Sequence, residues 1–412
     1  MPETMHFCHV TTFYPPHSFG GDAIAVQRLC EALARRGHQV TVVSDSDAYF
    51  AMGGTDVDVP APAGVQALRL RSGHALADKF LVHQTGRPVR QKRRIAKILN
   101  DPSIDLIHFH NVSLLGGPGV LRMGRAPKLY SAHEHWLVCP THVLWRHQRE
   151  PCQQRQCLRC QLRHHRPPQL WRAGSFLVRE AAHIDVFLAM SEFSRDKHHE
   201  FGWPTPMEVL PPFVADAQIA GGVERHESGS GGRPYFLLPG RVEHFKGIDT
   251  AIAAFAGYEQ ADLLIAGDGT ATASLRASTH EIANIRWLGK TMPDELRSLY
   301  RGAVATIAPA RGYETFGLTL IESMAQGTPV IARNIGPFPE IIAASGGGLL
   351  FNDADELRSA ISRLQGNSAE RQALARDGLA ATRAQWSESA VLGRYLQIVA
   401  RTLQQHARDE VA

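Results

Sequence analysis

The sequence predicts an α/β protein of two doubly wound domains, each a parallel sheet covered by helices. Its 412 residues exceed the roughly 250–300 residues that one hydrophobic core usually reaches. Short apolar runs alternate with helical stretches in both halves, which is typical of parallel sheets covered on both faces. The alternation restarts after residues 220–234, a stretch rich in Gly and Ser whose composition is typical of a linker.

The first half opens with a strand at MHFCHVTTFY (5–14) and a helix over residues 22–36. The apolar residues Val26, Leu29 and Leu33 recur on one face of this helix, and Gly37 ends it. Four further buried strands are predicted at HQVTVVS (38–44), DLIHFHN (105–111), KLYSAH (128–133) and IDVFLAMS (184–191). We therefore expect the first domain to cover residues 1–212.

The second half repeats the pattern from residue 233 onward. Its predicted strands are YFLLPG (235–240), ADLLIAG (261–267), IRWLG (285–289), VATIAP (304–309) and PVIAR (329–333). We expect a second domain over residues 213–385, followed by a helical stretch over 386–412. Periodicity alone does not decide on which domain this last helix packs.

Composition and charge narrow the class of protein. No apolar run reaches the length of a membrane span, and MPETMHFCHV lacks the pattern of a signal peptide, so we expect a cytoplasmic protein. Residues 1–212 hold 25 Lys and Arg against 18 Asp and Glu, whereas the rest hold 19 against 22. The basic half could face phosphates, acidic glycans or an anionic membrane, or reflect ordinary variation. No nucleic-acid-binding module is present.

Two basic stretches lie in the first half. Residues 86–99 form one, and residues 141–172 hold seven arginines against one acid, Glu150. They predict peripheral contact with an anionic membrane or a lipid-diphosphate acceptor; solvated faces are the alternative.

Two loops of the second half carry cations and glycines directly after predicted strands. LPGRVEHFKG (238–247) places Gly240, Arg241 and Lys246 after the first strand, and Gly267 follows the second. Ligands of doubly wound sheets bind at the carboxyl ends of strands, where Arg and Lys suit a diphosphate. Glycine lets the backbone approach a ligand closely. A solvated loop with two cations is the alternative.

YETFGLTLIE (313–322) places two carboxylates eight positions apart in an apolar run. A strand ends just before it, and a helix is predicted to begin within it. Glu314 would therefore lie in the loop and Glu322 about one turn into the helix. The free N–H groups at Phe316, Gly317 and Leu318 favour an anion, and carboxylates accept hydrogen bonds from sugar hydroxyls.

These motifs, together with GTPVIARNIGPFPEII (327–342), resemble the donor domain of family-4 retaining glycosyltransferases over about 150 residues. The resemblance implies the GT-B fold, in which two Rossmann-like domains face each other across a cleft. It implies that Arg241 and Lys246 bind the donor diphosphate, that Glu314 and the amides of residues 316–318 hold the sugar, and that Glu322 binds the ribose. The backbone near Leu288 would hold the base, and the last helix would cross back to the first domain.

The resemblance extends to the first half. Gly20 and Gly21 stand before the first helix and look like the family's glycine loop, although a plain strand–helix turn is the alternative. His133 ends a strand, where it can bond a sugar hydroxyl or be a structural histidine, and Glu134 stands where the family commonly has Asp. We expect His108 and His110 to be structural, with a role as ligands as the alternative.

Four cysteines cluster within an insertion at about residues 139–172: Cys139, Cys152, Cys157 and Cys160. Four thiolates suit a structural zinc, which would staple this loop. Disulfides or free thiols, and an iron–sulfur cluster, are the alternatives.

The predicted reaction is retaining transfer of a sugar from a nucleotide-diphosphate sugar to a hydroxyl of a glycan, a lipid-linked or a small-molecule acceptor, in surface polysaccharide or glycoconjugate synthesis. The candidate catalytic residues are His133, Arg241, Lys246 and Glu314. No catalytic metal is implied. Asp45-Ser46-Asp47 resembles the metal motif of another glycosyltransferase fold, but aspartate pairs at this spacing arise easily in loops. A nucleotide-sugar isomerase or epimerase, a phosphorylase, and an inactive metal-stapled binding protein are the alternatives.

Overall fold

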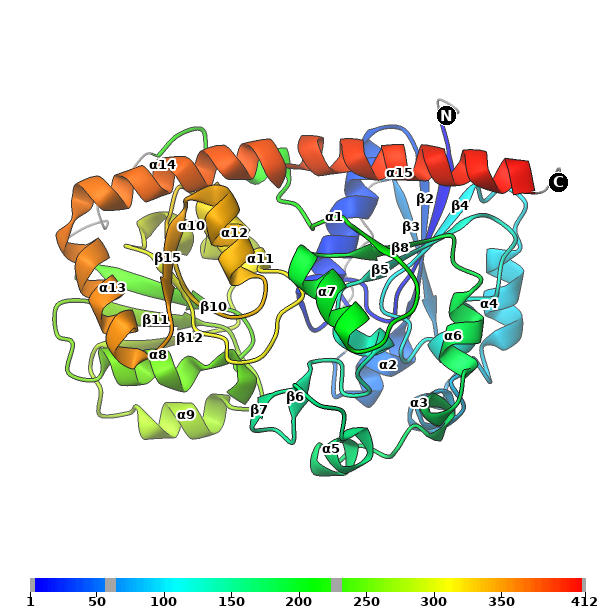
Figure 1. Cartoon of the computed structure of the whole chain (residues 1–412), viewed down its shortest axis with the longest axis horizontal. Helices are drawn as coiled ribbons and strands as arrows, with labels where there is room; N and C mark the ends of the chain where they lie inside the picture. Colours follow the sequence, from blue (N-terminus) through cyan, green and yellow to red (C-terminus); the bar gives the residue numbers. More distant parts are fainter. Residues whose placement is uncertain (1–3, 56–63, 224–231, 410–412) are drawn as a thin grey trace. The chain divides into compact units, whose positions relative to one another are not determined.

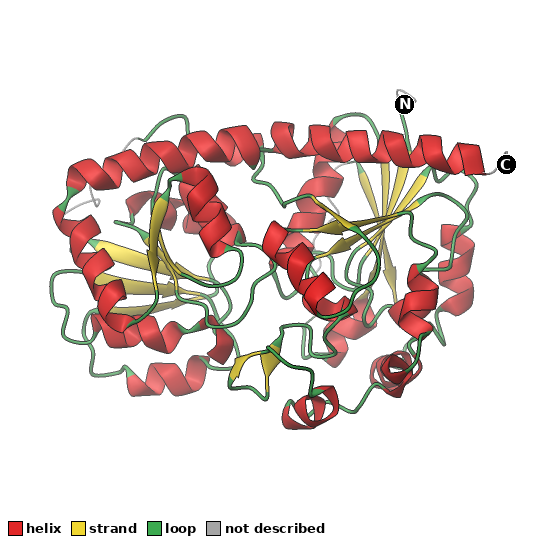
Figure 2. Ribbon diagram, viewed as in Figure 1, coloured by secondary structure: helices red, strands yellow, loops and turns green. Residues whose placement is uncertain are grey.

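The apolar runs of the sequence become strands of two parallel sheets (Figures 1 and 2). The computed structural model describes residues 4–55, 64–223 and 232–409. The first compact unit contains Met1–His142, Arg155–Pro211 and Val391–Ala412, and the second contains Val143–Gln154 and Pro212–Ala390. Of the Gly- and Ser-rich stretch at 220–234, residues 224–231 lie outside the described part of the chain.

The sheet of the first unit has the strand order β3-β2-β1-β4-β5-β8-β9, with all neighbours parallel. Its strands are β1 (His6–Val10), β2 (Gln39–Asp45), β3 (Val65–Leu70), β4 (Leu106–Phe109), β5 (Lys128–Ala132), β8 (Val186–Ala189) and β9 (Met207–Val209). The chain leaves β1 toward β2 and β3, then crosses to β4 on the other side of β1. This reversal makes the β1/β4 junction a topological switch point, where ligands of doubly wound sheets bind.

Helices cover both faces of this sheet (Figure 2). The helices of this unit are α1 (Gly21–Arg35), α2 (Ser46–Ala51), α3 (Ala75–Thr85), α4 (Lys92–Leu99), α5 (Cys157–Arg163), α6 (Phe176–Ala181), α7 (Glu192–Glu200) and most of α15 (Glu388–Asp409), and α5 lies apart from the sheet. The predicted apolar face of α1 is confirmed, since Val26, Leu29 and Leu33 are buried. Tyr395 of α15 is buried between Phe7 of β1 and His108 of β4.

The sheet of the second unit has the parallel order β12-β11-β10-β13-β14-β15, and its switch point lies between β10 and β13. Its strands are β10 (Tyr235–Pro239), β11 (Asp262–Ala266), β12 (Ile285–Gly289), β13 (Thr306–Ala308), β14 (Val330–Arg333) and β15 (Gly348–Phe351). Its helices are α8 (Ile248–Phe255), α9 (Thr272–Ser278), α10 (Pro293–Gly302), α11 (Leu318–Ala325), α12 (Phe338–Ser345), α13 (Ala354–Gly366) and α14 (Ser368–Gln385). Phe236, Leu263 and Ile307 lie at the centre of its core.

Every predicted strand is present, and the predicted fold class is confirmed. The prediction missed β3, β9 and β15 and the two-residue antiparallel strands β6 (Trp145–Arg146) and β7 (Glu150–Pro151). Among the described residues, no helix combines the length and the hydropathy needed to cross a membrane.

Candidate active site

The loop after β10 carries two of the predicted site cations. Arg241 is exposed and makes no hydrogen bond or ion pair with any other described residue. Lys246 ends a short 3-10 helix (His244–Lys246), and Gly247 then takes a left-handed conformation with φ +67° before α8 begins. The two cations therefore lie at the carboxyl edge of the sheet, beside its switch point.

Lys246 forms an ion pair with Glu314, which lies in the loop after β13. The two residues are 68 positions apart in sequence, and the two side chains keep 26% and 25% of their surface exposed. Backbone bonds join the same two loops, since the N–H groups of Arg311 and Gly312 donate to the carbonyl of Phe245 at 2.8 and 2.9 Å. The sequence analysis placed both charges at one edge of the sheet, but it did not predict that they touch.

The glycines of this edge let loops pack on one another. A Cβ on Gly247 would lie 2.1 Å from the carbonyl oxygen of Pro309, and a Cβ on Gly267 would lie 1.8 Å from that of Gly240. The loop after β11 is further tied to the loop after β10 by the bond from Gly240 N–H to the Ala266 carbonyl, at 2.9 Å. From the sequence we expected Gly267 to let a ligand approach closely; in the structure its close neighbour is another loop.

The helix α11 begins as predicted within YETFGLTLIE, with Gly317 as its N-cap and no side-chain cap. Its first N–H groups have no partner within the helix, so they can bind an anion. Phe316 is buried and packs edge-on against Trp386, with 6.4 Å between ring centroids. Leu318 opens the helix and is only partly buried.

Glu322 lies in the first half of α11 and is partly exposed. The hydroxyl of Tyr300, a buried residue of α10 that the sequence analysis did not single out, donates to a Glu322 oxygen at 3.4 Å. Leu288, at the end of β12, packs its side chain on an apolar cluster that includes Tyr300. The candidate site residues of the second unit thus follow four adjacent strands, in the order β12, β11, β10 and β13.

The candidate residues of the first unit lie after β1 and β5. Gly20 caps α1 in an extended conformation without a side-chain bond, and Gly21 begins the helix. His133 follows β5 and is partly exposed. Burial lowers the pKa of His133, and the carboxylates of Asp22 and Glu134 oppose this shift. The electrostatic influence of Asp22 places the start of α1 near His133, which sequence spacing alone does not reveal.

His133 is joined to histidines of the sheet. Its Nε2 lies 2.9 Å from Nδ1 of His110, whose Nε2 lies 3.0 Å from Nδ1 of His9. His108 uses both ring nitrogens with Ser131 and Tyr395. Burial lowers the pKa of His9 to about 3 and holds the pKa values of His108 and His110 well below the ordinary range.

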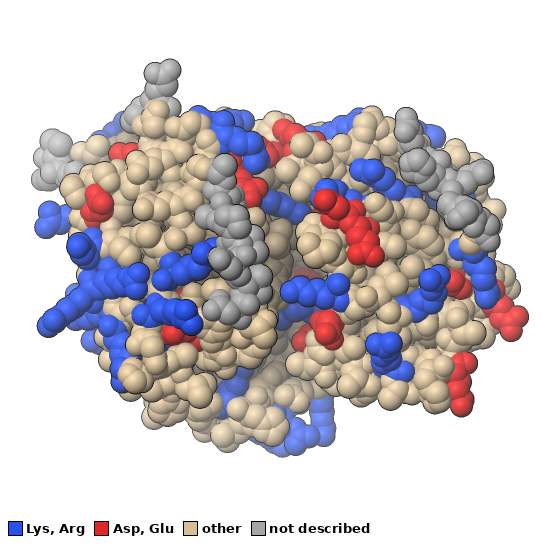
Figure 3. All heavy atoms as spheres, turned by 180° about the vertical axis from the view of Figure 1, so that it is seen from behind, with Lys and Arg blue, Asp and Glu red and all other residues tan. Residues whose placement is uncertain are grey.

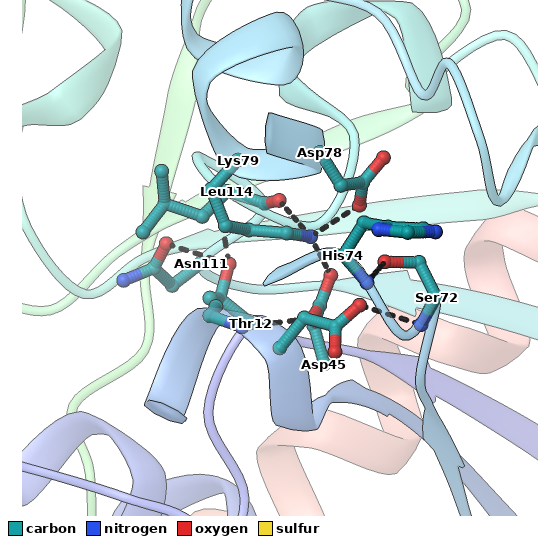
Figure 4. Close-up of polar contacts among 10 residues, drawn as sticks. Thr12, Asp45, Ser72, His74, Asp78, Lys79, Asn111 and Leu114 are labelled. Atoms are coloured by element: carbon teal, nitrogen blue, oxygen red, sulfur yellow. Dashed lines mark hydrogen bonds and ion pairs between the residues drawn. The ribbon is translucent and has the colours of Figure 1, made fainter. Parts of the chain in front are cut away.

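A buried polar network fixes the loops around β1, β2 and β4 (Figure 4). Lys79 of α3 reaches the carboxylates of Asp45 and Asp78 and donates to the Leu114 carbonyl at 3.0 Å. Burial raises the pKa of Asp45 to about 6, and Lys79 opposes the shift. The other carboxylate of the Asp-Ser-Asp sequence, that of Asp47, accepts from the Ser72 N–H at 2.6 Å. Both aspartates therefore have structural partners.

No disulfide joins any of the six cysteines, all of which lie in the described part of the chain, so the set Cys139, Cys152, Cys157 and Cys160 is not disulfide-linked. Within the described chain, the only three His, Cys, Asp or Glu residues with ligand atoms within 4.8 Å of one another are His9, His108 and His110. No three of the four clustered cysteines meet this distance criterion. A structural zinc that holds the inserted loop therefore remains a prediction from the sequence.

In the structure, Arg172 makes contacts that hold the inserted loop at about residues 139–172. Its guanidinium lies over the rings of Trp136 and Trp171, at 5.2 and 4.6 Å from the centroids, and it donates to the Trp136 carbonyl at 2.9 Å. Cation–π contacts of this kind contribute roughly 0.5–2 kcal/mol each.

Comparison with known proteins agrees with this geometry. Residues 19–218 match the family described as Glycosyltransferase Family 4, and residues 223–379 match Glycosyl transferases group 1. A phosphatidyl-myo-inositol mannosyltransferase of Mycolicibacterium smegmatis is 26% identical over 84% of this chain and 82% of its own length. One of Propionibacterium freudenreichii is 29% identical, but the match spans 41% of this chain and less than half, 44%, of that protein.

Solved structures share the fold. Sucrose-phosphate synthase from Thermosynechococcus elongatus superposes with a TM-score of 0.75 at 19% identity, covering 97% of this chain and all of that one. Anabaena HepE in complex with UDP-glucose gives 0.67 at 15% identity, with 97% and 100% covered. The chain therefore carries a glycosyltransferase family 4 domain followed by a glycosyl transferases group 1 domain, and it has the GT-B fold.

Proposed function

We propose that the protein transfers a glycosyl group from a nucleotide-diphosphate sugar to an acceptor hydroxyl with retention of anomeric configuration. The observation that carries the proposal is the Lys246–Glu314 pair beside the uncapped start of α11, with Glu322 farther along the same helix. An anion site flanked by two carboxylates suits a diphosphate between a sugar and a ribose. Structural relatives solved with UDP and UDP-glucose support a donor of this class.

In this proposal each donor-side residue has one role. Arg241 and Lys246 neutralise the diphosphate, Glu314 and the amides of residues 316–318 hold the sugar, and Glu322 accepts from ribose hydroxyls. The backbone at Leu288 faces the base, and Gly240 and Gly267 keep the loops in register. Gly20, Gly21 and His133 serve the acceptor side.

The transfer breaks the bond between the anomeric carbon and the diphosphate oxygen, and the acceptor oxygen bonds to that carbon on the same face. The acceptor proton moves to the leaving phosphate oxygen, so no protein nucleophile is needed. Negative charge grows on the departing diphosphate, where Arg241, Lys246 and the α11 amides stabilise it. Such preorganised groups typically contribute roughly 100- to 1000-fold each to kcat.

The acceptor is proposed to be a glycan, a lipid-linked or a small-molecule hydroxyl in surface polysaccharide or glycoconjugate synthesis. The first unit exposes Leu76 and Phe80 of α3, with 73% and 57% of their surface accessible, and Leu158 and Leu162 of α5. Arginines and lysines gather on one face of the same unit (Figure 3). Apolar side chains among cations suit peripheral contact with an anionic membrane.

Vesicle sedimentation tests the membrane contact. Leu76→Ser with Phe80→Ser should reduce binding to vesicles of anionic phospholipid severalfold. Met292→Ser, at a side chain 70% exposed in the second unit, should not. Equal binding by both variants would refute this surface.

A panel of nucleotide sugars with candidate acceptors tests the reaction. We expect one donor to release its nucleoside diphosphate with formation of a glycoside, and Glu314→Ala to abolish this with little loss of stability. Glu281→Ala, at a carboxylate 87% exposed in the same unit, is the matched control. Conversion of a nucleotide sugar without release of the diphosphate would indicate an isomerase and overturn the proposal.

A further inference from the structure

The histidines of the first unit form a row on one face of its sheet. Side chains alternate across a strand, so Phe7 and His9 of β1 share a face, and His9 is in register with His108 of β4. The row runs from His9 to His110 to His133, with 3.0 and 2.9 Å between the facing ring nitrogens. It begins in the core, where His9 and His110 are buried, and ends at the partly exposed His133.

Each contact in this row needs one N–H donor and one lone-pair acceptor. Burial disfavours charge and lowers the pKa values of His9, His110 and His133, so the three rings are neutral and each carries one proton. A row of neutral imidazoles has only two consistent arrangements. Either every ring donates toward His133, or every ring donates toward His9.

The buried end of the row distinguishes the two arrangements. Nε2 of His9 has no hydrogen-bond partner among the described residues. Donation toward His9 would leave an N–H on this atom unpaired in the core, and orphaned buried N–H groups are rare. Donation toward His133 leaves only a lone pair on Nε2 of His9, so this arrangement is favoured at the buried end of the row.

The charges at the other end favour the same arrangement. When all rings donate toward His133, the positive ends of their dipoles point to the carboxylates of Asp22 and Glu134, which both act on His133. Aligned hydrogen bonds also polarise one another and strengthen the row. Glu134 is itself held by Nδ1 of His142 at 2.8 Å.

We propose that the row His9–His110–His133 fixes His133 as the neutral tautomer with its proton on Nδ1, so that His133 donates a hydrogen bond to a ligand oxygen and is not a general base. His110 and His9 are positioning residues that act through His133. The row cannot relay protons further into the protein, because Nε2 of His9 at its buried end has no hydrogen-bond partner among the described residues. The inference rests on the proposed function only in that a ligand reaches His133.

A metal on the same histidines is the competing arrangement. The ligand atoms of His9, His108 and His110 lie within 4.8 Å of one another. However, five of the six ring nitrogens of these residues already have partners within hydrogen-bond distance. A stoichiometric metal in the purified protein that is lost in His9→Phe would overturn the tautomer assignment.

Nitrogen-15 NMR of the full-length protein labelled at histidine tests the tautomer without any activity. The His133 signals are those that disappear in His133→Asn. We expect a protonated Nδ1 and an unprotonated Nε2 from pH 6 to 8, and His110→Phe should allow the Nε2–H form to appear. His183→Phe, at an exposed histidine of the same unit, should leave the His133 signals unchanged. A proton on Nε2, or on both nitrogens, at neutral pH in the wild-type protein would refute the proposal.

Kinetics separate a donor from a base once a substrate is known. Asparagine keeps an N–H donor near the Nδ1 position, so His133→Asn should lose about tenfold or less in kcat, with an unchanged pH profile. Loss of a general base typically costs roughly 100- to 10,000-fold. A loss in that range, with an acidic limb of the wild-type profile that disappears in the variant, would show that His133 is a base. If no nucleotide sugar is turned over, the proposed function fails while the NMR result still decides the tautomer.

Discussion

Replacing Lys246 with alanine should separate catalysis from stability. The side chains of Lys246 and Glu314 keep about a quarter of their surface exposed, so their ion pair is partly solvated. Pairs of this kind contribute about 0–1 kcal/mol to the free energy of unfolding. For a domain of about 150–250 residues, 1 kcal/mol corresponds to a Tm change of roughly 2–4 °C.

The same change should affect turnover far more. In the proposed reaction Lys246 meets the charge that grows on the leaving diphosphate, so its loss should reduce kcat roughly 100- to 1000-fold. This corresponds to about 2.7–4 kcal/mol in the activation free energy. The expected loss in catalysis therefore exceeds the expected loss in stability severalfold.

The assay follows release of the nucleoside diphosphate, and thermal unfolding is measured on the same samples. Arg376→Ala, which removes an exposed cation from α14 of the same unit, is the matched control and should change neither value. A Lys246→Ala variant that folds normally and keeps its activity within about threefold would refute the role given to this lysine.

Three further predictions concern the scaffold. Gly247→Ala should destabilise the protein by about 1–3 kcal/mol and weaken nucleotide binding, because the added Cβ meets a carbonyl of the neighbouring loop at 2.1 Å. The control is Gly257→Ala, at a glycine with φ +81° and open space around it, which should still bind nucleotide. Equal loss of binding in both variants would contradict this prediction. Burial lowers the pKa of His9 from 6.5 to about 3 in the folded protein. As the pH falls below 6.5, this histidine therefore takes up a proton in the unfolded chain but not in the folded one, and the folded protein becomes less stable. Between pH 7 and pH 5, the free energy of unfolding measured with urea should fall by about 2 kcal/mol less in His9→Phe than in the wild type. An equal fall in both proteins would contradict the assignment of His9 as a buried neutral imidazole. Lys79→Met should cost about 3–5 kcal/mol at pH 8 by leaving buried carboxylates without a cation, and less at pH 5, because burial raises the pKa of Asp45 to about 6; a cost independent of pH would argue against this.

The sequence predicted the central strands because parallel strands buried on both faces appear as continuous apolar runs. The strands it missed lie at sheet edges, where fewer apolar residues are needed. VQALRL of β3 mixes exposed and buried positions, β9 has three residues, and β15 is a four-residue edge strand with a partly exposed GLLF sequence.

The candidate donor-site residues could be grouped from the sequence because parallel strands bring their carboxyl ends to one edge of the sheet. Contacts between loops could not be predicted from the sequence. The Lys246–Glu314 pair depends on how two loops fold over that edge, and the glycines between them serve packing that no local pattern reveals. The histidine row depends on the register of β1 against β4, although HFHN carries His108 and His110 two positions apart, at the spacing of one strand face.

Hydrogen–deuterium exchange with saturating UDP tests the central claim most directly, that the second unit holds a nucleotide diphosphate at the carboxyl edge of its sheet. We expect slower exchange of the amides at residues 240–247, 267–270, 287–289 and 316–320, with little change elsewhere in that unit. Bound UDP that protects only residues of the first unit, or leaves the start of α11 unprotected, would contradict it.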